Sequence, residues 1–292
     1  MLSTNRKLVA SIMAEFGEGP NGGGLWLPDH VVRSAAIGDN GRAYFTGRES
    51  FVAAGSGDDW INAGADSMID GGKGNDSINM IDGGEAYGGQ GDDGLTGSYA
   101  QLHGGVGDDG IDVLTGSEGY GDEGRDHIRA ILGGVGFGGT GADVLTALYG
   151  GTIHGGEQDD VLSAVGRKNT LSGDEGDDSI DLTQAIDSVV TYGRGDGHDT
   201  IVVGSGYKEF GETQHGSNTL ALWNIRSTDA TIEQNGDEAI IRFKGTDADS
   251  IKITFTDDTA LAITFRDGTS QILSRQHQSG LVAQVNAAYQ GV

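Results

Sequence analysis

The most regular feature of the chain is an apolar residue that returns about every 17 positions between residues 54 and 181. Eight short segments align on it, beginning at residues 54, 71, 88, 104, 121, 138, 155 and 173. Their eighth position is always Ile or Leu: Ile61, Ile78, Leu95, Ile111, Ile128, Leu145, Leu162 and Ile180. A fixed period of this length predicts a stacked repeat in which each coil sends one strand residue into a narrow core.

An acidic position keeps the same phase as the apolar one. The sixth position is Asp in all eight segments: Asp59, Asp76, Asp93, Asp109, Asp126, Asp143, Asp160 and Asp178. A weaker ninth segment puts Asp199 in the same phase, after Gly195 and Gly197. Chance does not place so many carboxylates at one phase, so a merely solvated acidic face is a poor explanation.

Glycine dominates the start of each segment. Positions two and four hold Gly55 and Gly57, Gly72 and Gly74, Gly89 and Gly91, Gly105 and Gly107, Asp122 and Gly124, Gly139 and Gly141, Gly156 and Gln158, and Asp174 and Gly176. Glycine tolerates positive φ, so such a loop can turn its carbonyl oxygens toward one point, with the Asp carboxylate at the end of the turn. Because Ca²⁺ takes six to eight oxygen ligands, one loop cannot supply them all, and an ion would lie between successive loops.

The segments resemble the nonapeptide G-G-x-G-x-D-x-U-x of the RTX (repeats-in-toxin) family of calcium-binding β-rolls. The resemblance implies that the loop carbonyls at positions two and four and the sixth-position carboxylates bind Ca²⁺. Eight stacked loops enclose seven gaps, so we expect about seven ions. The second half of each coil lacks the motif and keeps only a turn glycine, at Gly83, Gly116, Gly133 and Gly150. We therefore predict an all-β, parallel β-roll with a single calcium row.

Three regions are expected along the chain. Residues 1–53 would form an N-terminal helix or lid and a metal-free capping rung, with Arg42 in the Asp place and Tyr44 in the Ile place; a cleaved signal peptide is the alternative for the first residues. Residues 54–188 would form the roll. Residues 189–292 would form a β-rich cap, with antiparallel strands near 219–223, 230–234, 238–243, 250–255 and 261–265 and a short helix at 280–290. This last region resembles the part of haemolysin-type proteins that carries an uncleaved type I secretion signal.

Composition narrows the possible partners. Acidic residues outnumber basic ones 44 to 18, for a net charge of −26, and glycine accounts for 54 of 292 residues. That charge repels nucleic acids and anionic membranes and suits hard cations. The chain has no cysteine, which excludes disulfides and thiolate metal sites. It also has no apolar run long enough to span a membrane.

No catalytic motif is present, and we expect no enzyme activity. Residues that directly precede the loops form a ring-bearing column, which predicts a stack about 4.8 Å apart: Tyr87, His103, Tyr120, Phe137 and His154. The column is either a structural ladder or a strip that binds a sugar or another partner. The loops' third and fifth positions are too irregular for an ice-binding array.

The function expected from the sequence is that of a secreted calcium-binding protein that folds outside the cell or at its surface and has a structural, adhesive or secretion role. The type I secretion apparatus would be one partner, and the oligomeric state stays open. The alternatives are the C-terminal secretion part of a larger toxin or hydrolase, and a non-catalytic polysaccharide-binding module.

Overall fold

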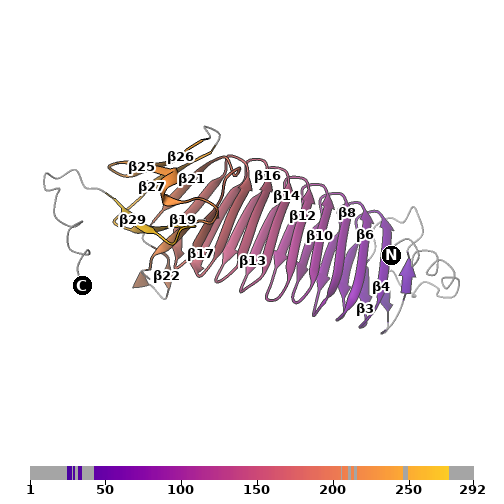
Figure 1. The fold of residues 1–292 in the computed structure, drawn as a ribbon. Coiled ribbons are helices and arrows are strands. Elements are labelled where there is room, and N and C mark those ends of the chain that lie inside the picture. The colour runs from indigo at the N-terminus through magenta and orange to yellow at the C-terminus, as the bar shows by residue number, and fades with distance from the viewer. Residues whose placement is uncertain are drawn as a thin grey trace.

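The computed structural model describes residues 25–27, 29, 32–34, 43–204, 206–209, 212–213, 216–245 and 249–275. The helices expected near residues 1–16 and 280–290 lie outside these ranges. The described chain forms an elongated roll, with its coils stacked in sequence order and a C-terminal block at one end (Figure 1). No helix in the described ranges is long and apolar enough to cross a membrane.

Each coil gives one strand to each of two long sheets. The first sheet runs in the order β1 (Leu25–Leu27), β3 (Ala43–Thr46), β5 (Trp60–Ala63), β7 (Ser77–Met80), β9 (Gly94–Gly97), β11 (Gly110–Val113), β13 (His127–Ile131), β15 (Val144–Leu148), β17 (Val161–Arg167), β19 (Ser179–Ile186), β21 (His198–Val203), β27 (Ser250–Phe255), β26 (Glu238–Phe243) and β25 (Ala230–Asn235). Its strands pair in parallel as far as β27, so the predicted parallel β-roll is confirmed.

The second sheet is built from the other half of each coil. It runs in the order β2 (Val32–Ser34), β4 (Phe51–Ser56), β6 (Ser67–Lys73), β8 (Gly84–Gln90), β10 (Gln101–Val106), β12 (Glu118–Glu123), β14 (Val135–Thr140), β16 (Thr152–Glu157), β18 (Thr170–Glu175), β20 (Val189–Tyr192), β24 (Asn218–Leu222), β28 (Ala260–Phe265) and β29 (Ser270–Ser274). A small hairpin, β22 (Lys208–Glu209) and β23 (Glu212–Thr213), and a 3-10 turn at Ser227–Asp229 complete the described elements.

The core is a thin layer between the two sheets. The eight apolar residues of the repeat lie in register along the first sheet and are at most 1% exposed. Tyr44 takes the same place in the preceding rung, where it pairs with Ile61 and is fully buried. Opposite them, the second sheet contributes Val52, Ile69, Leu102 and other buried residues. Because each sheet buries alternate residues, the strict period of the sequence fixes which side chains fill the core.

Every coil has two edges, which differ in sequence. At the Asp edge, a loop joins an even-numbered strand to the next odd-numbered strand and contains the sixth-position Asp. At the second-turn edge, another short turn joins the odd-numbered strand back to an even-numbered one. The glycines expected there, Gly83, Gly116, Gly133 and Gly150, have φ values of 84°, 72°, 87° and 93°. They are therefore turn residues in the left-handed region, as predicted.

The C-terminal block differs in part from expectation. Antiparallel pairing occurs between β25, β26 and β27 and between β28 and β29. However, β24 pairs in parallel with β20 and β28, and β27 pairs in parallel with β21. The prediction that all of these strands are antiparallel is wrong, because three of them extend the two sheets of the roll before the last hairpins turn back. Both sheets thus continue through residue 189.

Candidate metal site

The sixth-position Asp residues form a buried column along the Asp edge. Each is 1–3% exposed, and Asp199 occupies the ninth place. From Asp76 to Asp199, one oxygen of each carboxylate accepts a hydrogen bond from the backbone N–H of the Asp one coil earlier. Asp109 Oδ1 lies 2.7 Å from Asp93 N, and Asp126 Oδ1 lies 2.8 Å from Asp109 N. The ladder ends with Asp178 N donating to Asp199 Oδ1 at 3.2 Å.

The second carboxylate oxygen has a different environment. Among the residues that the structure describes, no hydrogen-bond donor reaches the buried Oδ2 atoms of Asp76, Asp93, Asp109, Asp126, Asp143, Asp160 and Asp178. A buried carboxylate oxygen without a donor costs several kcal/mol of solvation, so native proteins supply a partner or a cation. Seven such atoms in one line indicate that each coil of this edge requires a hydrogen-bond donor or a cation.

The first position of each segment explains where these oxygens point. A Cβ built on Gly104 would lie 2.8 Å from Gly121 O of the next coil and nearer still to Asp109 Oδ2. Only glycine leaves this space open, so a carboxylate oxygen and a carbonyl oxygen meet there. In the described residues the same pair of oxygens recurs at Gly71, Gly88, Gly104, Gly121, Gly138 and Gly155. The sequence interpretation did not include these residues among the ligands, although glycine at position one of seven segments was a visible signal.

Positions two and four bring further carbonyl oxygens to this edge. Gly105 and Gly107 have φ values of 115° and 142°, and a Cβ on Gly105 would clash with Gly89 O of the preceding coil. The loops therefore stack with carbonyl oxygens against glycine Cα atoms. Where the segment departs from glycine, the backbone keeps the same conformation: φ is 73° at Asp122, 80° at Gln158 and 67° at Asp174.

The carboxylates of these two extra Asp residues leave the loop. Asp122 Oδ2 lies 3.4 Å from His103 Nδ1, and Asp174 Oδ2 lies 3.2 Å from His154 Nδ1. Each histidine of the ring column is thus matched, one coil later, by an Asp in place of a loop glycine. These side chains face away from the buried column, so Asp122 and Asp174 can contribute only their carbonyls to the loop.

Burial changes the protonation of the column. Desolvation raises the pKa of Asp109 to about 7, the hydrogen bond from Asp93 N partly offsets the rise, and the charges of neighbouring Asp residues add to it. The same cause raises the pKa of the other members, to about 7 for Asp76, about 6 for Asp93 and Asp126, about 8 for Asp160 and Asp199, and about 7 for Asp178. The ionised column is therefore unfavourable unless positive charge is brought to it.

A metal at this edge would have to rely on backbone oxygens. Within the described ranges, no group of three or more His, Cys, Asp or Glu side chains is placed to hold a metal ion. The gaps at the position-one glycines instead bring one carboxylate oxygen beside a backbone carbonyl oxygen of the next coil. This oxygen-only donor set fits Ca²⁺, which accepts carbonyls beside carboxylates, and does not fit zinc, which prefers nitrogen and sulfur ligands.

The ring column is confirmed as a stacked ladder, and it lies on the outer face of the second sheet. Ring centroids from Tyr87 to His154 are 4.7–5.1 Å apart, with interplanar angles of 6–12°. The faces of the inner rings are therefore covered by their neighbours, and only ring edges remain open. This geometry favours the structural interpretation, because a sugar cannot lie flat on His103, Tyr120 or Phe137. A role of the column in binding a partner stays a prediction.

The first Asp of each Asp-Asp pair also has a structural role. Asp58 Oδ1 accepts from Asn75 N at 2.8 Å, and Asp108 Oδ1 accepts from Arg125 N at 3.0 Å. These side chains are exposed, and their carboxylates cap backbone N–H groups of the next coil.

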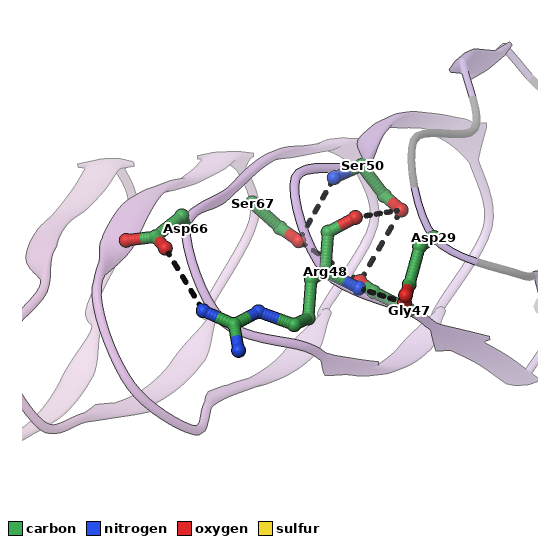
Figure 2. Close-up of polar contacts among 6 residues, drawn as sticks. All are labelled: Asp29, Gly47, Arg48, Ser50, Asp66 and Ser67. Carbon is green, nitrogen blue, oxygen red and sulfur yellow. Dashed lines mark hydrogen bonds and ion pairs between the residues drawn. The ribbon is translucent and has the colours of Figure 1, made fainter.

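The second-turn edge satisfies its backbone with neutral side chains. Ser67 Oγ accepts from Ser50 N at 3.1 Å and donates to Gly47 O at 3.2 Å (Figure 2). Ser117 Oγ does the same between Ala100 N and Gly97 O. Farther along, Asn169 and Ser188 take this place. Because each hydroxyl both accepts and donates, this edge has no need of a cation.

Comparison with known proteins adds little to this geometry. No protein-family model and no curated protein matches the chain. Among solved structures it is similar to the X-ray crystal structure of a hyperactive, Ca²⁺-dependent, beta-helical antifreeze protein from an Antarctic bacterium. The two are 16% identical, the match covers 73% of this chain and 88% of the other, and the TM-score is 0.44. A likeness at this level does not identify the ligand or the role of this chain.

Proposed function

We propose that the chain is a calcium-binding β-roll protein whose loops are completed by one row of Ca²⁺ ions along the Asp edge. The observation that supports this most directly is the repeated pair of oxygens at the position-one glycines, a donor-free Asp Oδ2 and a carbonyl of the next coil. The sixth-position carboxylates would hold the ions together with loop carbonyls from positions one, two and four. When bound, Ca²⁺ supplies the positive charge that the column lacks and links each loop to the next.

Calcium binding and folding would be one event in such a protein. Each candidate gap combines oxygens from two coils, so it exists only when both coils are stacked. An ion that binds the native state alone stabilises it by mass action. We infer that the chain gains most of its stability only where calcium is abundant.

The biological role that fits this behaviour is extracellular. We propose a secreted or surface-attached structural or adhesive protein, exported through a type I apparatus and not catalytic. The RTX-like repeats, the net charge of −26 and the absence of cysteine support this proposal. The alternative, a secretion part of a larger toxin or hydrolase, differs in that the complete gene would encode a catalytic domain as well.

The proposal can be tested by calcium titration of the purified chain, with circular dichroism for folding and calorimetry for stoichiometry. We expect little β-signal in excess chelator, a cooperative gain with Ca²⁺ and a much weaker response to Mg²⁺, which demands tight octahedral geometry. Full β-structure in chelator, unchanged by calcium, would contradict the proposal.

A matched pair of variants sharpens the test. In Asp109→Asn, the amide oxygen can still accept from Asp93 N, but the oxygen that faces Gly121 O is replaced by an amide nitrogen. We expect about a tenfold higher calcium midpoint, or about 1.4 kcal/mol. Asp108→Asn removes the same charge from the exposed neighbour and should leave the midpoint almost unchanged. Equal effects of the two variants would mean that calcium responds only to overall charge.

A further inference from the structure

The second-turn edge contains a window without charge. The turns between its strands, at residues 98–100, 114–117, 132–134 and 149–151, hold no Asp, Glu, Lys or Arg, and the exposed Glu118 at the start of β12 is the charge next to them. The turns on either side are charged, with Asp66 and Asp82 before the window and Arg167 and Lys168 after it. A partner that approaches this edge therefore meets a neutral surface, whereas the Asp edge presents carboxylates.

Large apolar side chains stand exposed inside this window. Tyr99 is 62% exposed, Leu132 is 60% exposed and Tyr149 is 46% exposed. We call these three residues the apolar stripe. Hydrogen bonds join its turns in sequence, from Tyr99 N to Thr115 O, from Thr115 Oγ1 to Leu132 O and from Leu132 N to Leu148 O. Three coils separate the two tyrosines, a span of about 14 Å at 4.8 Å per coil.

The backbone under the stripe is not one that these residues favour. Tyr99, Leu132 and Tyr149 have φ values of 57°, 51° and 50°, in the left-handed region. At Leu132–Gly133 and Tyr149–Gly150 the two successive positive φ values match the centre of a type I′ turn, which favours Asn-Gly. Turns outside the window share this backbone, since Asp66 and Lys168 also have positive φ, but a bulky apolar side chain is unfavourable in this region. Folding alone would be better served by Asn or Gly.

Both tyrosine rings rest on a glycine of the following coil. A Cβ on Gly116 would lie 2.6 Å from Tyr99 Cδ1, and a Cβ on Gly166 would lie 2.6 Å from Tyr149 Cδ1. Tyr149 also meets Tyr207 edge-on at 6.1 Å, and Arg167 donates to the Tyr207 hydroxyl at 2.9 Å. Tyr207 therefore bounds the stripe at its C-terminal end.

The size and chemistry of the stripe restrict its partner. Three side chains of at most about 250 Å² each, partly exposed, fall well short of the roughly 800 Å² per partner of a stable protein interface. An extended peptide would need open backbone groups, but Tyr99 N, Leu132 N and Tyr149 N already donate to the next turns. A charged polymer would find no counter-charge in the window.

We propose that the apolar stripe binds a neutral, linear sugar polymer running along the roll between Tyr149 and Tyr99. Sugar rings would pack on the tyrosines and Leu132, and their hydroxyl groups would meet the uncharged Ser98, Gln101 and Thr115 that surround the stripe. This site lies on the edge opposite the Asp column and does not use calcium as a ligand. Its failure would leave the calcium proposal intact.

The test is affinity electrophoresis of the full chain in saturating calcium through gels containing hydroxyethyl cellulose, galactomannan, amylose or dextran. Carboxymethyl cellulose serves as the charged control. We expect retardation by at least one neutral polymer, and at least a tenfold weaker retardation for Tyr99→Asn and Tyr149→Asn. Because Asn suits the left-handed backbone, both variants should keep the wild-type β-signal and melt at the same or a higher temperature.

A matched control is Lys168→Asn, which changes a residue with φ of 61° on the same edge but outside the window and should retain full binding. No retardation of the folded wild type by any neutral polymer would overturn the proposal, as would binding to the charged polymer alone or unchanged binding by both tyrosine variants. Sedimentation velocity measures the oligomeric state of the wild type and of Tyr99→Asn. A wild-type dimer that Tyr99→Asn abolishes would show that a second copy of the chain covers the stripe instead of a sugar polymer.

Discussion

The two edges of the roll join the same strands at the same spacing, yet they stabilise their turns in opposite ways. At the second-turn edge, Ser67 and Ser117 accept one hydrogen bond and donate another, so every oxygen in that column has a partner. At the Asp edge, the carboxylates accept through Oδ1 but have nothing to donate through Oδ2. The difference is one of chemistry rather than geometry. A hydroxyl column is complete in itself, whereas a carboxylate column is complete only with a cation.

The largest effect that would sharpen this comparison is that of pH on the metal-free chain. Burial raises the pKa of the column to about 6 to 8, above the ordinary value of 3.8. The native state therefore binds protons that the unfolded chain does not, and stability is lost as the pH rises through this range. In chelator, we expect β-signal and melting temperature to increase as the pH is lowered from 8 to 5.

The same protons should act in the opposite direction when calcium is present. They compete with Ca²⁺ for the carboxylates, so the calcium concentration at the folding midpoint should increase as the pH is lowered from 8 to 5. The serine hydroxyls of the second-turn edge, such as those of Ser67 and Ser117, do not titrate in this range. They contribute to neither the pH dependence of stability nor that of the calcium midpoint. If the circular-dichroism signal of β-structure in chelator instead fell as the pH was lowered from 8 to 5, the contrast between the two edges would be wrong.

An intermediate effect is expected from filling one gap of the Asp edge. In Gly104→Ala, the new Cβ would meet Asp109 Oδ2 and Gly121 O, which should cost about 2–3 kcal/mol and remove one bound ion. Gly110 lies in the same coil, and its Cβ would meet only Asp93 O, at 3.9 Å. Gly110→Ala should therefore fold with unchanged stoichiometry, measured by calorimetry. Loss of an ion from both variants would show that the gap is not the site.

The smallest effect is expected at the second-turn edge. In Ser117→Ala, Ala100 N loses its acceptor and Gly97 O loses a donor, which should cost about 1–2 kcal/mol. Because no ion is involved, the calcium stoichiometry should not change and the loss should be similar at all calcium concentrations at which the chain is folded. Thermal melts at two saturating calcium concentrations measure this, and a stoichiometry reduced by one would assign metal to both edges.

The periodic part of this molecule could be predicted from its sequence because each coil repeats the same demands. Residues of the types represented by Ile78, Asp93 and Gly116 each recur at their own fixed place in the repeat. The core, the acidic column and the turn glycines therefore followed directly from spacing. The ring ladder followed too, although its outward orientation required knowledge of which residues the second sheet buries.

The unpredicted features have no fixed residue type or depend on a partner far away in the chain. The neutral side chains that satisfy the second-turn edge change in type from Ser117 to Asn169, so no single residue type identifies them in the sequence. The pairing of His154 with Asp174 joins residues that no motif connects. Alternation in the C-terminal strands predicts which residues are buried but not the direction of the neighbouring strand, so the parallel pairing of β24, β27 and β28 was missed.

Both buried columns give the molecule a polarity along its axis. Asp93 N and Ala100 N each depend on a side chain of the coil that follows, never on the one before. Removing coils from the N-terminal end exposes carboxylates and hydroxyls, which water solvates readily. Removing them from the C-terminal end instead exposes backbone N–H donors, because Asn218 and Asp199 supply the last acceptors. The two ends of the roll therefore differ chemically: the N-terminal end presents hydrogen-bond acceptors and the C-terminal end presents hydrogen-bond donors.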